Sequence, residues 1–375
     1  AHCLTYLEKQ RNAFWLYGEK PFLQMPAIKK AKKQKLSAVL PDVATGNNVL
    51  VFETQKERQL ENADKALLIL TLMSFALGGK KTDNSISLTE GYEKKPTGKP
   101  GTGMGYLGYL HSFPLGSNVQ ETIWLNLLTE EQLKEQSWTA GIGIPPWEEM
   151  PEGEACPIAI RMKESYLGRL IPLSRFCLLT EDDIHYSEGI NFSDHKEGGV
   201  DPSVAVDRSK KEWKAMWVDP EKRPWRMVTS FLSYLGKKNS FDCLFIRGGM
   251  SRAKNIPIFG IWSGGLRVSS NAGEQYVSGS DDFVESKIFL SAETIGNSKW
   301  FWQIEEEMDY LDRLSKTIHR SVFNYYKQLK NEGSEHARIA ANLFWQLCEK
   351  HAQELFQTET PKNLRKKFYA LAMSL

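Results

Sequence analysis

Residues 98–128 read GKPGTGMGYLGYLHSFPLGSNVQETIWLNLL, a glycine-rich segment with a lysine that runs directly into an apolar one. Glycine tolerates positive φ and lets a backbone come close to another molecule, so the first part is typical of a loop that contacts a phosphate or a nucleic-acid groove. A flexible surface loop has the same composition and is the alternative. The apolar part predicts a helix or a strand, and residues 120–128 are predicted to lie in the core.

The composition of the 375-residue chain is that of an ordinary globular protein, with 41% hydrophobic and 25% charged residues. This length suits two domains with a sizeable core. The formal net charge is only +2, so any contact with nucleic acid depends on local basic patches. The five cysteines include no C-x-x-C pair, which argues against a zinc ribbon and a disulfide framework and favours a reducing cytoplasm.

The sequence shows no sign of a membrane protein or a secreted one. Its best apolar run, residues 66–77, is too short to span a bilayer and contains Thr71 and Ser74. No secretory signal opens the chain. It begins Ala-His-Cys without a methionine, so we expect the natural start to be missing. We expect a cytoplasmic protein with no membrane partner.

The densest basic cluster lies at residues 29–35, which read KKAKKQK. Such clusters are usually solvated faces. The functional alternative is contact with phosphates, where each neutralised phosphate adds salt-sensitive affinity.

Residues 241–282 are predicted to hold short strands and turns. Residues 243–246 and 256–261 resemble strands, and Gly264-Gly265 is expected to end the second one. The tip that follows, residues 267–271, reads RVSSN. Hydroxyl and amide groups can donate hydrogen bonds to minor-groove acceptors, so this composition is typical of a groove reader, while an ordinary hairpin turn is the alternative.

From about Asn297 the pattern becomes helical. Apolar residues recur at helical spacing at Ile304, Met308, Leu311, Ile318 and Val322. Two further amphipathic segments follow, and short connections between long helices predict an antiparallel bundle. The predicted fold class is α+β, with a large mixed α/β domain over residues 1–290 and a helical bundle over residues 291–375.

The sequence holds no recognisable catalytic constellation. It lacks the P-loop, nucleophile-elbow and H-E-x-x-H motifs, and the glycine-rich segment lacks the strand and helix cap of a dinucleotide fingerprint. The best cluster of acidic residues with a histidine is Asp182-Asp183 with His185, which leaves a metal-dependent hydrolase as the alternative function. Paired carboxylates in turns are common without a metal. We therefore favour a binding or assembly role without enzyme activity, cofactor or metal.

Several motifs follow one another in a characteristic order. They are residues 21–24 (PFLQ), residues 46–48 (GNN) with 50–52, a helix ending at Gly78-Gly79, the glycine-rich segment, residues 120–128, residues 262–267 (WSGGLR) and the terminal helical bundle. This order resembles the CasA family, the large subunit of the type I-E CRISPR Cascade complex. The resemblance covers most of the chain.

The resemblance implies an RNA-guided role in prokaryotic antiviral defence, within a ribonucleoprotein complex. In that family the mixed α/β domain carries loops that recognise the protospacer-adjacent motif in double-stranded DNA from the minor-groove side. The helical bundle helps to hold the opened DNA of the R-loop. The implied partners are double-stranded target DNA, the Cascade subunits that contain the CRISPR RNA, and the helicase-nuclease effector that the subunit recruits. The subunit is not itself a nuclease.

The resemblance also implies site residues. The residues expected to read the motif are Gly98, Lys99, Gly101, Gly103 and Gly105 in the glycine loop, Arg267, Ser269, Ser270 and Asn271 in the wedge, and a position near Asn191. The residues expected at nucleic-acid backbones or at the guide are Lys29, Lys30, Lys32, Lys33, Lys56 and Arg58, the last two in the family's mobile loop at residues 52–64. Serines stand here where the family's wedge often has a glutamine. A scaffold subunit without DNA contact is a third reading.

Overall fold

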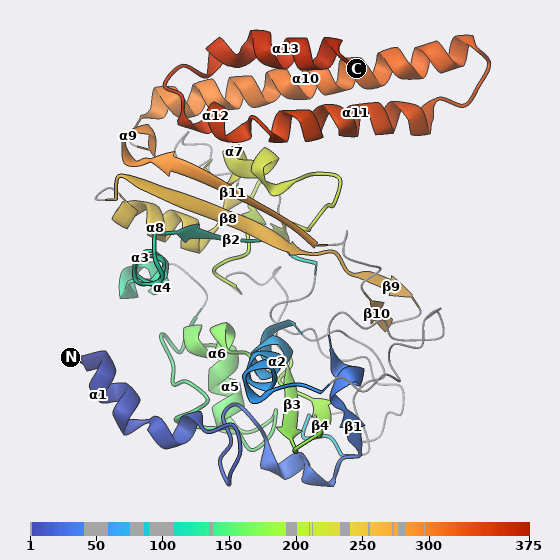
Figure 1. Cartoon of the computed structure of the whole chain (residues 1–375). Helices are drawn as coiled ribbons and strands as arrows, with labels where there is room; N and C mark the ends of the chain where they lie inside the picture. The colour runs from blue at the N-terminus through green and yellow to red at the C-terminus, as the bar shows by residue number, and fades with distance from the viewer. Residues whose placement is uncertain are drawn as a thin grey trace. The chain divides into compact units, whose positions relative to one another are not determined.

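The computed structural model describes residues 2–40, 59–75, 86–89, 108–134, 138–192, 201–209, 211, 213–232, 241–253, 256–271, 274–276, 283–295 and 297–375. The chain forms two compact units. Unit 1 comprises Ala1–Tyr109, Thr129–Asp201 and Leu266–Phe283, and unit 2 comprises Leu110–Leu128, Pro202–Gly265 and Val284–Leu375. The α+β class is confirmed: both units combine helices with small sheets (Figure 1).

The two units divide the chain differently from the boundary expected at residue 290. The C-terminal helices share a hydrophobic core with strand residues Val284, Ile288 and Leu290, so they form one unit with a sheet. A second core lies wholly in unit 1. The physical reason is that the apolar faces of the C-terminal helices are buried against earlier segments of the chain as well as against each other.

Unit 1 is built around an antiparallel sheet of β1 (Lys33–Lys35), β4 (Asp183–Glu188) and β3 (Arg175–Leu179), in the order β1-β4-β3. The other elements of this unit are α1 (His2–Lys9), η1 (Arg11–Phe14), η2 (Pro26–Lys30), η3 (Leu36–Val39), α2 (Asn62–Phe75), α4 (Glu130–Lys134), α5 (Pro157–Lys163), α6 (Tyr166–Leu170), β9 (Ser269–Asn271) and β10 (Glu274–Tyr276). Of these, α2 packs on β3, and η2 packs on β3 and β4.

A buried glutamine ties the start of unit 1 to this sheet. The Gln24 side chain is 2% exposed; its Nε2 donates to the Leu16 carbonyl over 2.7 Å, and its Oε1 accepts from the Leu179 amide over 2.7 Å. The neighbouring Met25 amide donates to the Cys177 carbonyl over 2.8 Å. A buried amide needs such partners, so the PFLQ motif has a structural role.

Unit 2 is built around a sheet of β2 (His111–Leu115), β8 (Ile258–Leu266) and β11 (Phe283–Ser291), with β8 between the other two. Helices α3 (Val119–Asn126) and α8 (Leu244–Ala253) pack on β2 and on each other. The smaller elements are β5 (Val206–Asp207), β6 (Lys214–Ala215), β7 (Phe241–Asp242), η6 (Pro224–Met227), α7 (Val228–Phe231) and α9 (Ala292–Ile295). Figure 1 shows α3 and α8 on one side of the β2-β8-β11 sheet and the C-terminal helices on the other.

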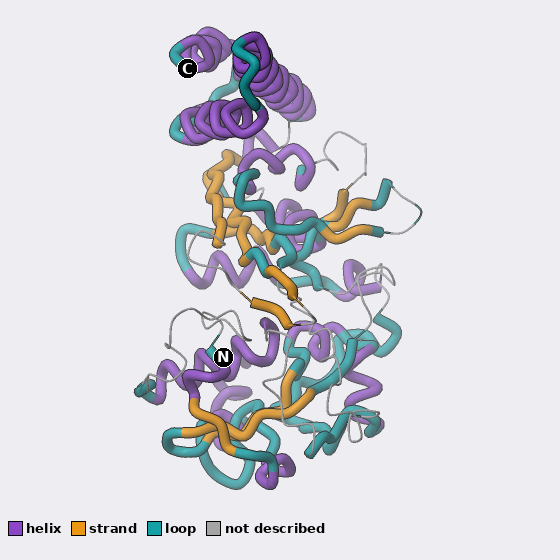
Figure 2. The backbone as a smooth tube through the Cα atoms, turned by 90° about the vertical axis from the view of Figure 1, so that its right-hand side faces the viewer, coloured by secondary structure: helices purple, strands orange, loops and turns teal. Residues whose placement is uncertain are grey.

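The C-terminal helices form the predicted bundle, visible as a group in Figure 2. Its elements are α10 (Ser298–Gln328), α11 (Ser334–Glu349), α12 (Ala352–Gln357), η9 (Pro361–Leu364) and α13 (Arg365–Met373). The predicted periodicity is confirmed, because Ile304, Met308 and Leu311 are buried on one face of α10. Helix α11 packs on α10, and α13 packs on both.

One predicted strand is wrong. The apolar run at residues 243–246 predicts a strand, but α8 begins at Leu244 and only Phe241–Asp242 forms a strand, β7. The run is the first turn of a helix that buries Leu244, Ile246 and Met250. Four apolar residues in a row do not distinguish a buried strand from one turn of a buried helix.

We predict that Gly249→Ala destabilises unit 2. A Cβ at residue 249 would lie 2.4 Å from Pro114 Cγ and 2.8 Å from the Leu125 carbonyl oxygen, so α8 would have to move away from β2 and α3. Such overpacking costs about 1–3 kcal/mol in the free energy of unfolding, which urea denaturation measures. The control is Ser251→Ala on the exposed side of the same helix, which is expected to stay within about 0.5 kcal/mol. Equal effects of the two substitutions would contradict this packing.

We also predict that ion pairs make the bundle acid-sensitive. Hydrogen bonds from Arg365 and then Lys362 hold the pKa of the Glu306 carboxyl below its usual value. A lowered folded-state pKa means that this contribution to stability is present above the ordinary glutamate pKa of about 4.3 and is lost as the pH falls. Arg365→Met should therefore flatten the decline of the urea midpoint between neutral and acid pH, while Lys366→Met, on an exposed side chain, should leave it as in the wild type.

Candidate nucleic-acid interface

Strand β8 leads directly to the predicted wedge. Gly264-Gly265 was expected to end this strand, but β8 continues through both glycines to Leu266. A Cβ on Gly264 would lie 2.8 Å from the Trp262 ring and 2.9 Å from the Val284 carbonyl oxygen. The glycine therefore marks a close approach of neighbouring groups in the strand and not a break.

The wedge residues follow as a small hairpin in unit 1. The side chain of Arg267 is exposed. Strands β9 and β10 pair antiparallel, with Ser269 opposite Tyr276, Ser270 opposite Gln275 and Asn271 opposite Glu274. The Ser-Ser-Asn sequence thus forms the first strand of a short hairpin, and Arg267 precedes that strand by two residues, as both the groove-reading interpretation and the simple hairpin interpretation allow.

The predicted basic cluster lies at the edge of the β1-β4-β3 sheet. Lys29 and Lys30 end η2, Lys33 lies in β1, and the side chains of these residues and of Lys32 are exposed. β1 is an edge strand, where lysines also discourage pairing with another chain. The same residues present a row of cations to solvent, which suits contact with phosphates.

The other predicted contacts are only partly described. Asn191 is partly exposed and lies between two buried residues, Ile190 and Phe192, just after β4. Gly98, Lys99, Gly101, Gly103, Gly105, Lys56 and Arg58 lie outside the described residues.

Asp182, Asp183 and His185 do not form the metal site that the alternative function requires. His185 is 4% exposed, and its Nδ1 lies 2.6 Å from the Ala31 carbonyl oxygen. Asp183 instead faces Lys35 across the β1–β4 ladder, with an Nζ–Oδ1 distance of 3.5 Å. Across the part of the chain that the structure describes, no three His, Cys, Asp or Glu side chains are grouped to hold a metal ion.

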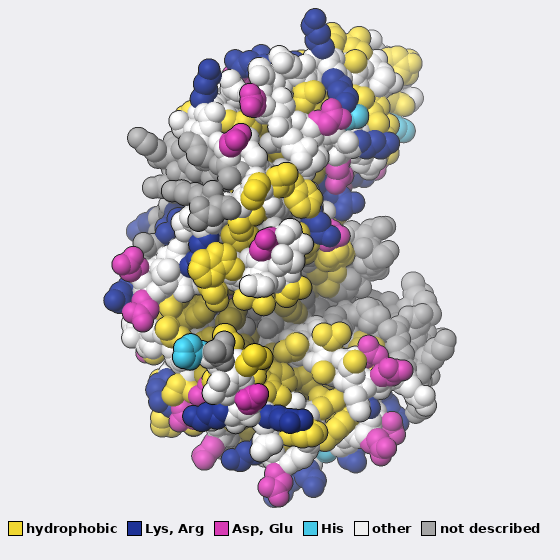
Figure 3. Space-filling view, turned by 60° about the vertical axis from the view of Figure 1, so that its left-hand side comes forward, with side chains coloured by type: hydrophobic (Ala, Val, Ile, Leu, Met, Phe, Trp, Pro, Cys, Tyr) yellow, Lys and Arg dark blue, Asp and Glu magenta, His cyan; other side chains and the backbone are white. Residues whose placement is uncertain are grey.

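An exposed apolar helix is the feature that the sequence interpretation missed. Residues 120–128 were predicted to lie in the core, but within α3 only Leu125 is buried, and Ile123 and Trp124 are 58% and 55% exposed. The guanidinium of Arg252 lies 5.7 Å from the centre of a Trp124 ring. Figure 3, which brings this side of Figure 1 forward, shows hydrophobic side chains at the surface in the middle of the view.

A sequence signal for this surface helix exists at its start. The Asn118 side chain accepts a hydrogen bond from the Glu121 amide over 2.9 Å, and the Glu121 carboxylate accepts one from the Ser117 amide over 2.8 Å. An Asn followed three residues later by Glu is the pattern of a capping box. This pattern predicts a helix with a solvated first turn. The mainly apolar composition of residues 120–128 favoured the core interpretation instead.

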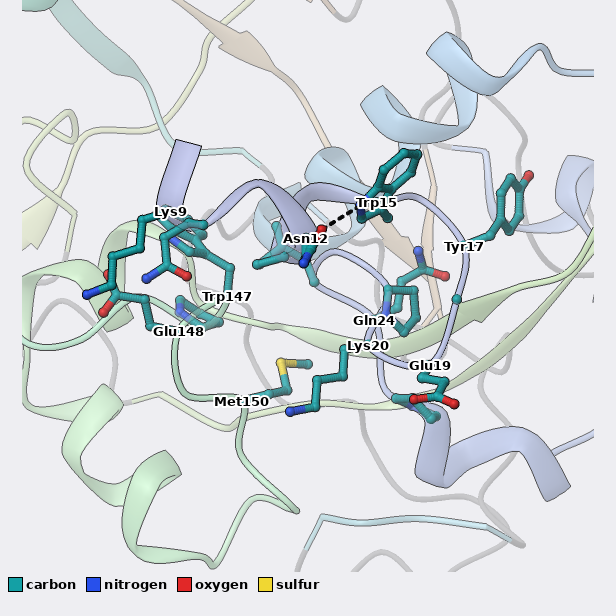
Figure 4. A pocket seen from close by; sticks show the side chains of 17 residues that line it. Lys9, Asn12, Trp15, Tyr17, Glu19, Lys20, Gln24, Trp147, Glu148 and Met150 are labelled. Carbon is teal, nitrogen blue, oxygen red and sulfur yellow. Dashed lines mark hydrogen bonds between the residues drawn. The ribbon is translucent and has the colours of Figure 1, made fainter. Parts of the chain in front are cut away.

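A cavity of about 670 Å³ opens in unit 1 between residues 9–26 and 146–150. Two lining residues, Trp147 and Glu148, are already hydrogen-bonded within the protein. Trp147 Nε1 donates to the Tyr6 hydroxyl over 2.7 Å, and that hydroxyl donates to the Glu148 carboxylate. Figure 4 shows Lys9 near Trp147 and Glu148, with Trp15 and Tyr17 at the opposite side. Its charged lining residues are Lys9, Lys20, Glu19 and Glu148. Equal numbers of cations and carboxylates give the cavity no preference for a polyanion.

The comparisons with known proteins agree on one family. The family model of the CRISPR-associated protein Cse1 matches residues 1–371, and the chain belongs to this family. The resemblance to CasA is thereby confirmed. A CasA/Cse1 protein of Thermus thermophilus is 26% identical over 250 residues, which are 62% of this chain and 45% of that protein. The match therefore spans less than half the length of this relative.

Solved structures show the same fold. The crystal structure of CasA from Thermus thermophilus matches with a TM-score of 0.65 and 17% identity, covering 99% of this chain and 76% of the other. Cse1 from Acidimicrobium ferrooxidans matches with a TM-score of 0.67 and 14% identity, covering 99% and 75%. A chain in a structure of a CRISPR RNA-guided surveillance complex matches with a TM-score of 0.61 and 13% identity, covering 99% and 76%.

No helix within the described residues is long and apolar enough to cross a membrane.

We predict that the purified protein holds no stoichiometric metal at Asp182, Asp183 and His185. Because Asp183 pairs with Lys35 and His185 contacts a carbonyl, Asp183→Ala should leave the metal content unchanged. Elemental analysis after extensive dialysis measures it, with Asp309→Ala, on an exposed aspartate of α10, as the control. If the wild type binds one metal ion per chain and only Asp183→Ala loses it, this prediction is contradicted and the hydrolase alternative is supported.

Proposed function

We propose that the chain acts as the large subunit of a CRISPR RNA-guided surveillance complex of the Cascade type in the cytoplasm. In this role it recognises the protospacer-adjacent motif in double-stranded DNA, helps to open the duplex and hold the R-loop, and recruits the helicase-nuclease. It has no catalytic activity of its own. The observation that carries the proposal is the match of the Cse1 family model to residues 1–371.

The hairpin after β8 supports a role in motif reading. Arg267 is exposed, and the paired strands β9 and β10 hold Ser269–Asn271 in a short, defined backbone. The minor groove is narrow and presents a degenerate pattern of hydrogen-bond groups, so a small hairpin with one cation suits a short, permissive motif. The proposed reading atoms are the hydroxyls and the amide of this segment.

The basic edge of unit 1 supports a separate, sequence-independent contribution. Lys29, Lys30, Lys32 and Lys33 are exposed and close together in the chain, so they can neutralise neighbouring phosphates. Phosphate contacts position a protein on nucleic acid without reading its sequence. In RNA-guided systems, pairing with the guide then reads the target, while the protein reads only the flanking motif. Recruitment of the helicase-nuclease rests on the family resemblance alone.

A scaffold subunit without DNA contact is the third reading, and salt dependence separates it from the proposed function. Motif recognition with phosphate contacts predicts target affinity that falls steeply with salt when this chain is present. A scaffold predicts the same salt dependence with and without it.

We predict that Asn271→Ala and Gly103→Asp weaken motif-dependent binding of duplex DNA by the reconstituted complex and leave its assembly intact. Loss of a base contact costs roughly 1–3 kcal/mol, which is about 5- to 150-fold in Kd. Gel shift with target DNA that carries or lacks the flanking motif measures the effect, and size-exclusion chromatography checks assembly.

The matched control is Asn331→Ala, on an exposed asparagine between α10 and α11, which should bind as the wild type. If both site variants bind motif-bearing DNA as tightly as the wild type, the assignment of the wedge and the glycine loop is wrong.

A further inference from the structure

A second, smaller cavity lies in unit 1 beside the basic edge of the sheet. Its volume is about 350 Å³, and it is lined by Lys35, Leu36, Ser37, Gln59, Leu60, Lys65 and Asp182. These residues come from the end of β1, the start of η3, the approach to α2 and the turn before β4. The cavity is therefore assembled from three separate parts of the chain and shares Lys35 with the basic edge.

The distinctive group of this cavity is the ammonium of Lys65. The residue is only 7% exposed, and its Nζ donates to the Glu181 carbonyl oxygen over 2.5 Å. An ammonium group has three N–H donors, so one carbonyl acceptor does not satisfy its full hydrogen-bonding capacity. Among the described residues no carboxylate forms an ion pair with Lys65. A buried charge without a counter-ion is unfavourable unless a ligand supplies the opposite charge.

Charges of both signs surround Lys65. Gln59 and Leu60 come just before α2, a helix of 14 residues, and the partial positive charge of its N-terminal end is offset by Asp64 in the first turn, whose Oδ2 accepts from the Glu61 amide over 3.4 Å. Lys35 is half exposed, and its Nζ lies 3.5 Å from Asp183 Oδ1. The basic edge adjoins the cavity through Lys35, which lines it and belongs to the same strand, β1, as Lys33.

One lining residue opposes an anion. The Asp182 side chain is exposed and lies at the mouth of the cavity, where solvent screens it. Its presence gives the site a built-in test, because removing its charge should favour an anionic ligand while removing the charge of Lys65 should disfavour it.

We propose that this cavity binds a phosphate group of a nucleic-acid strand, with Lys65 as the inner cation. Ser37, Gln59 and Lys35 are further polar residues that line the cavity. The lysines of residues 29–33 then follow the adjoining phosphates along the same strand. This inference deepens the proposed function, since it rests on the basic edge being a nucleic-acid surface, and it gives that surface a defined anchoring point.

Binding of a fluorescein-labelled single-stranded RNA oligonucleotide to the purified chain, across a salt series, tests the proposal. Lys65→Met keeps the length and apolar stem of the side chain and removes one phosphate contact. It should lower the affinity several-fold and reduce the slope of log K against log salt by about 0.7, the value for one contact on a single strand. Asp182→Asn should raise the affinity. Lys20→Met, on an exposed lysine of the same unit, should leave the slope unchanged.

Lys65→Met and Asp182→Asn are expected to change the affinity for RNA in opposite directions, and a general loss of folding would not raise the affinity of either variant. Circular dichroism and Tm check that Lys65→Met is folded, and where it is not, the exposed Asp182→Asn variant decides alone. A wild-type slope in a folded Lys65→Met together with unchanged affinity in Asp182→Asn overturns the proposal. So does a rise of the wild-type Tm with inorganic phosphate, lost in Lys65→Met, when the oligonucleotide binds all variants equally, because the cavity then serves free phosphate.

The same variants in the reconstituted complex separate this inference from the proposed function. If motif-dependent target binding still requires this chain while Lys65→Met and Asp182→Asn change nothing, the cavity assignment fails and the proposed function stands. If the complex binds target equally without the chain, the proposed function fails whatever the oligonucleotide shows.

Discussion

The pairing of β8 with β2 and β11 is the constraint on which unit 2 depends. It brings together segments that are far apart in the sequence, and the register sets Phe113 opposite Trp262, whose rings stack at 5.0 Å. On the other face, the hydroxyls of Ser112 and Ser263 meet at 2.8 Å in a fully buried contact. The sheet then fixes α3 and α8 through β2, and it supplies the core residues of β11 that the C-terminal helices share. A slip of one residue would turn every one of these side chains to the wrong face.

The electrostatics of the chain fit a protein that samples nucleic acid weakly. Its net charge is close to zero, while cations are concentrated on the edge strand β1 and the turn before it. A local basic patch gives an affinity for nucleic acid that depends on the salt concentration. It does not create a long-range field strong enough to bind every polyanion tightly. In the proposed function, contacts to the phosphate backbone hold the complex on DNA, and the small hairpin after β8 gives selectivity for the flanking motif.

The sequence predicted best where a pattern repeats over many residues. The spacing of Ile304, Met308 and Leu311 predicted α10 correctly because a long amphipathic helix must bury a stripe of period 3.6. It predicted short apolar segments least well. Residues 243–246 were predicted to form a strand but lie at the start of helix α8, and residues 120–128 were predicted to lie in the core but belong largely to the surface helix α3. Burial there depends on which partner the tertiary structure supplies, and local composition does not contain that information.

The predicted site shows the same division. The lysines of residues 29–33 are exposed, as their charge requires, and Arg267 follows the strand that its neighbours form. Gly264 was misread because its role depends on the Trp262 ring and the Val284 carbonyl, which approach it only in the folded sheet. The burial of Lys65 could not be foreseen either, since its helix position alone places no partner beside it. The glycine loop at residues 98–105 stays a prediction.

Binding of duplex target DNA to the reconstituted guide complex, measured with and without this chain across a salt series, tests the proposed function most directly. The proposed function predicts that high affinity appears only with the chain, depends on the flanking motif and falls steeply as salt rises. Equal binding without the chain, or binding that ignores the motif at every salt concentration, would contradict it.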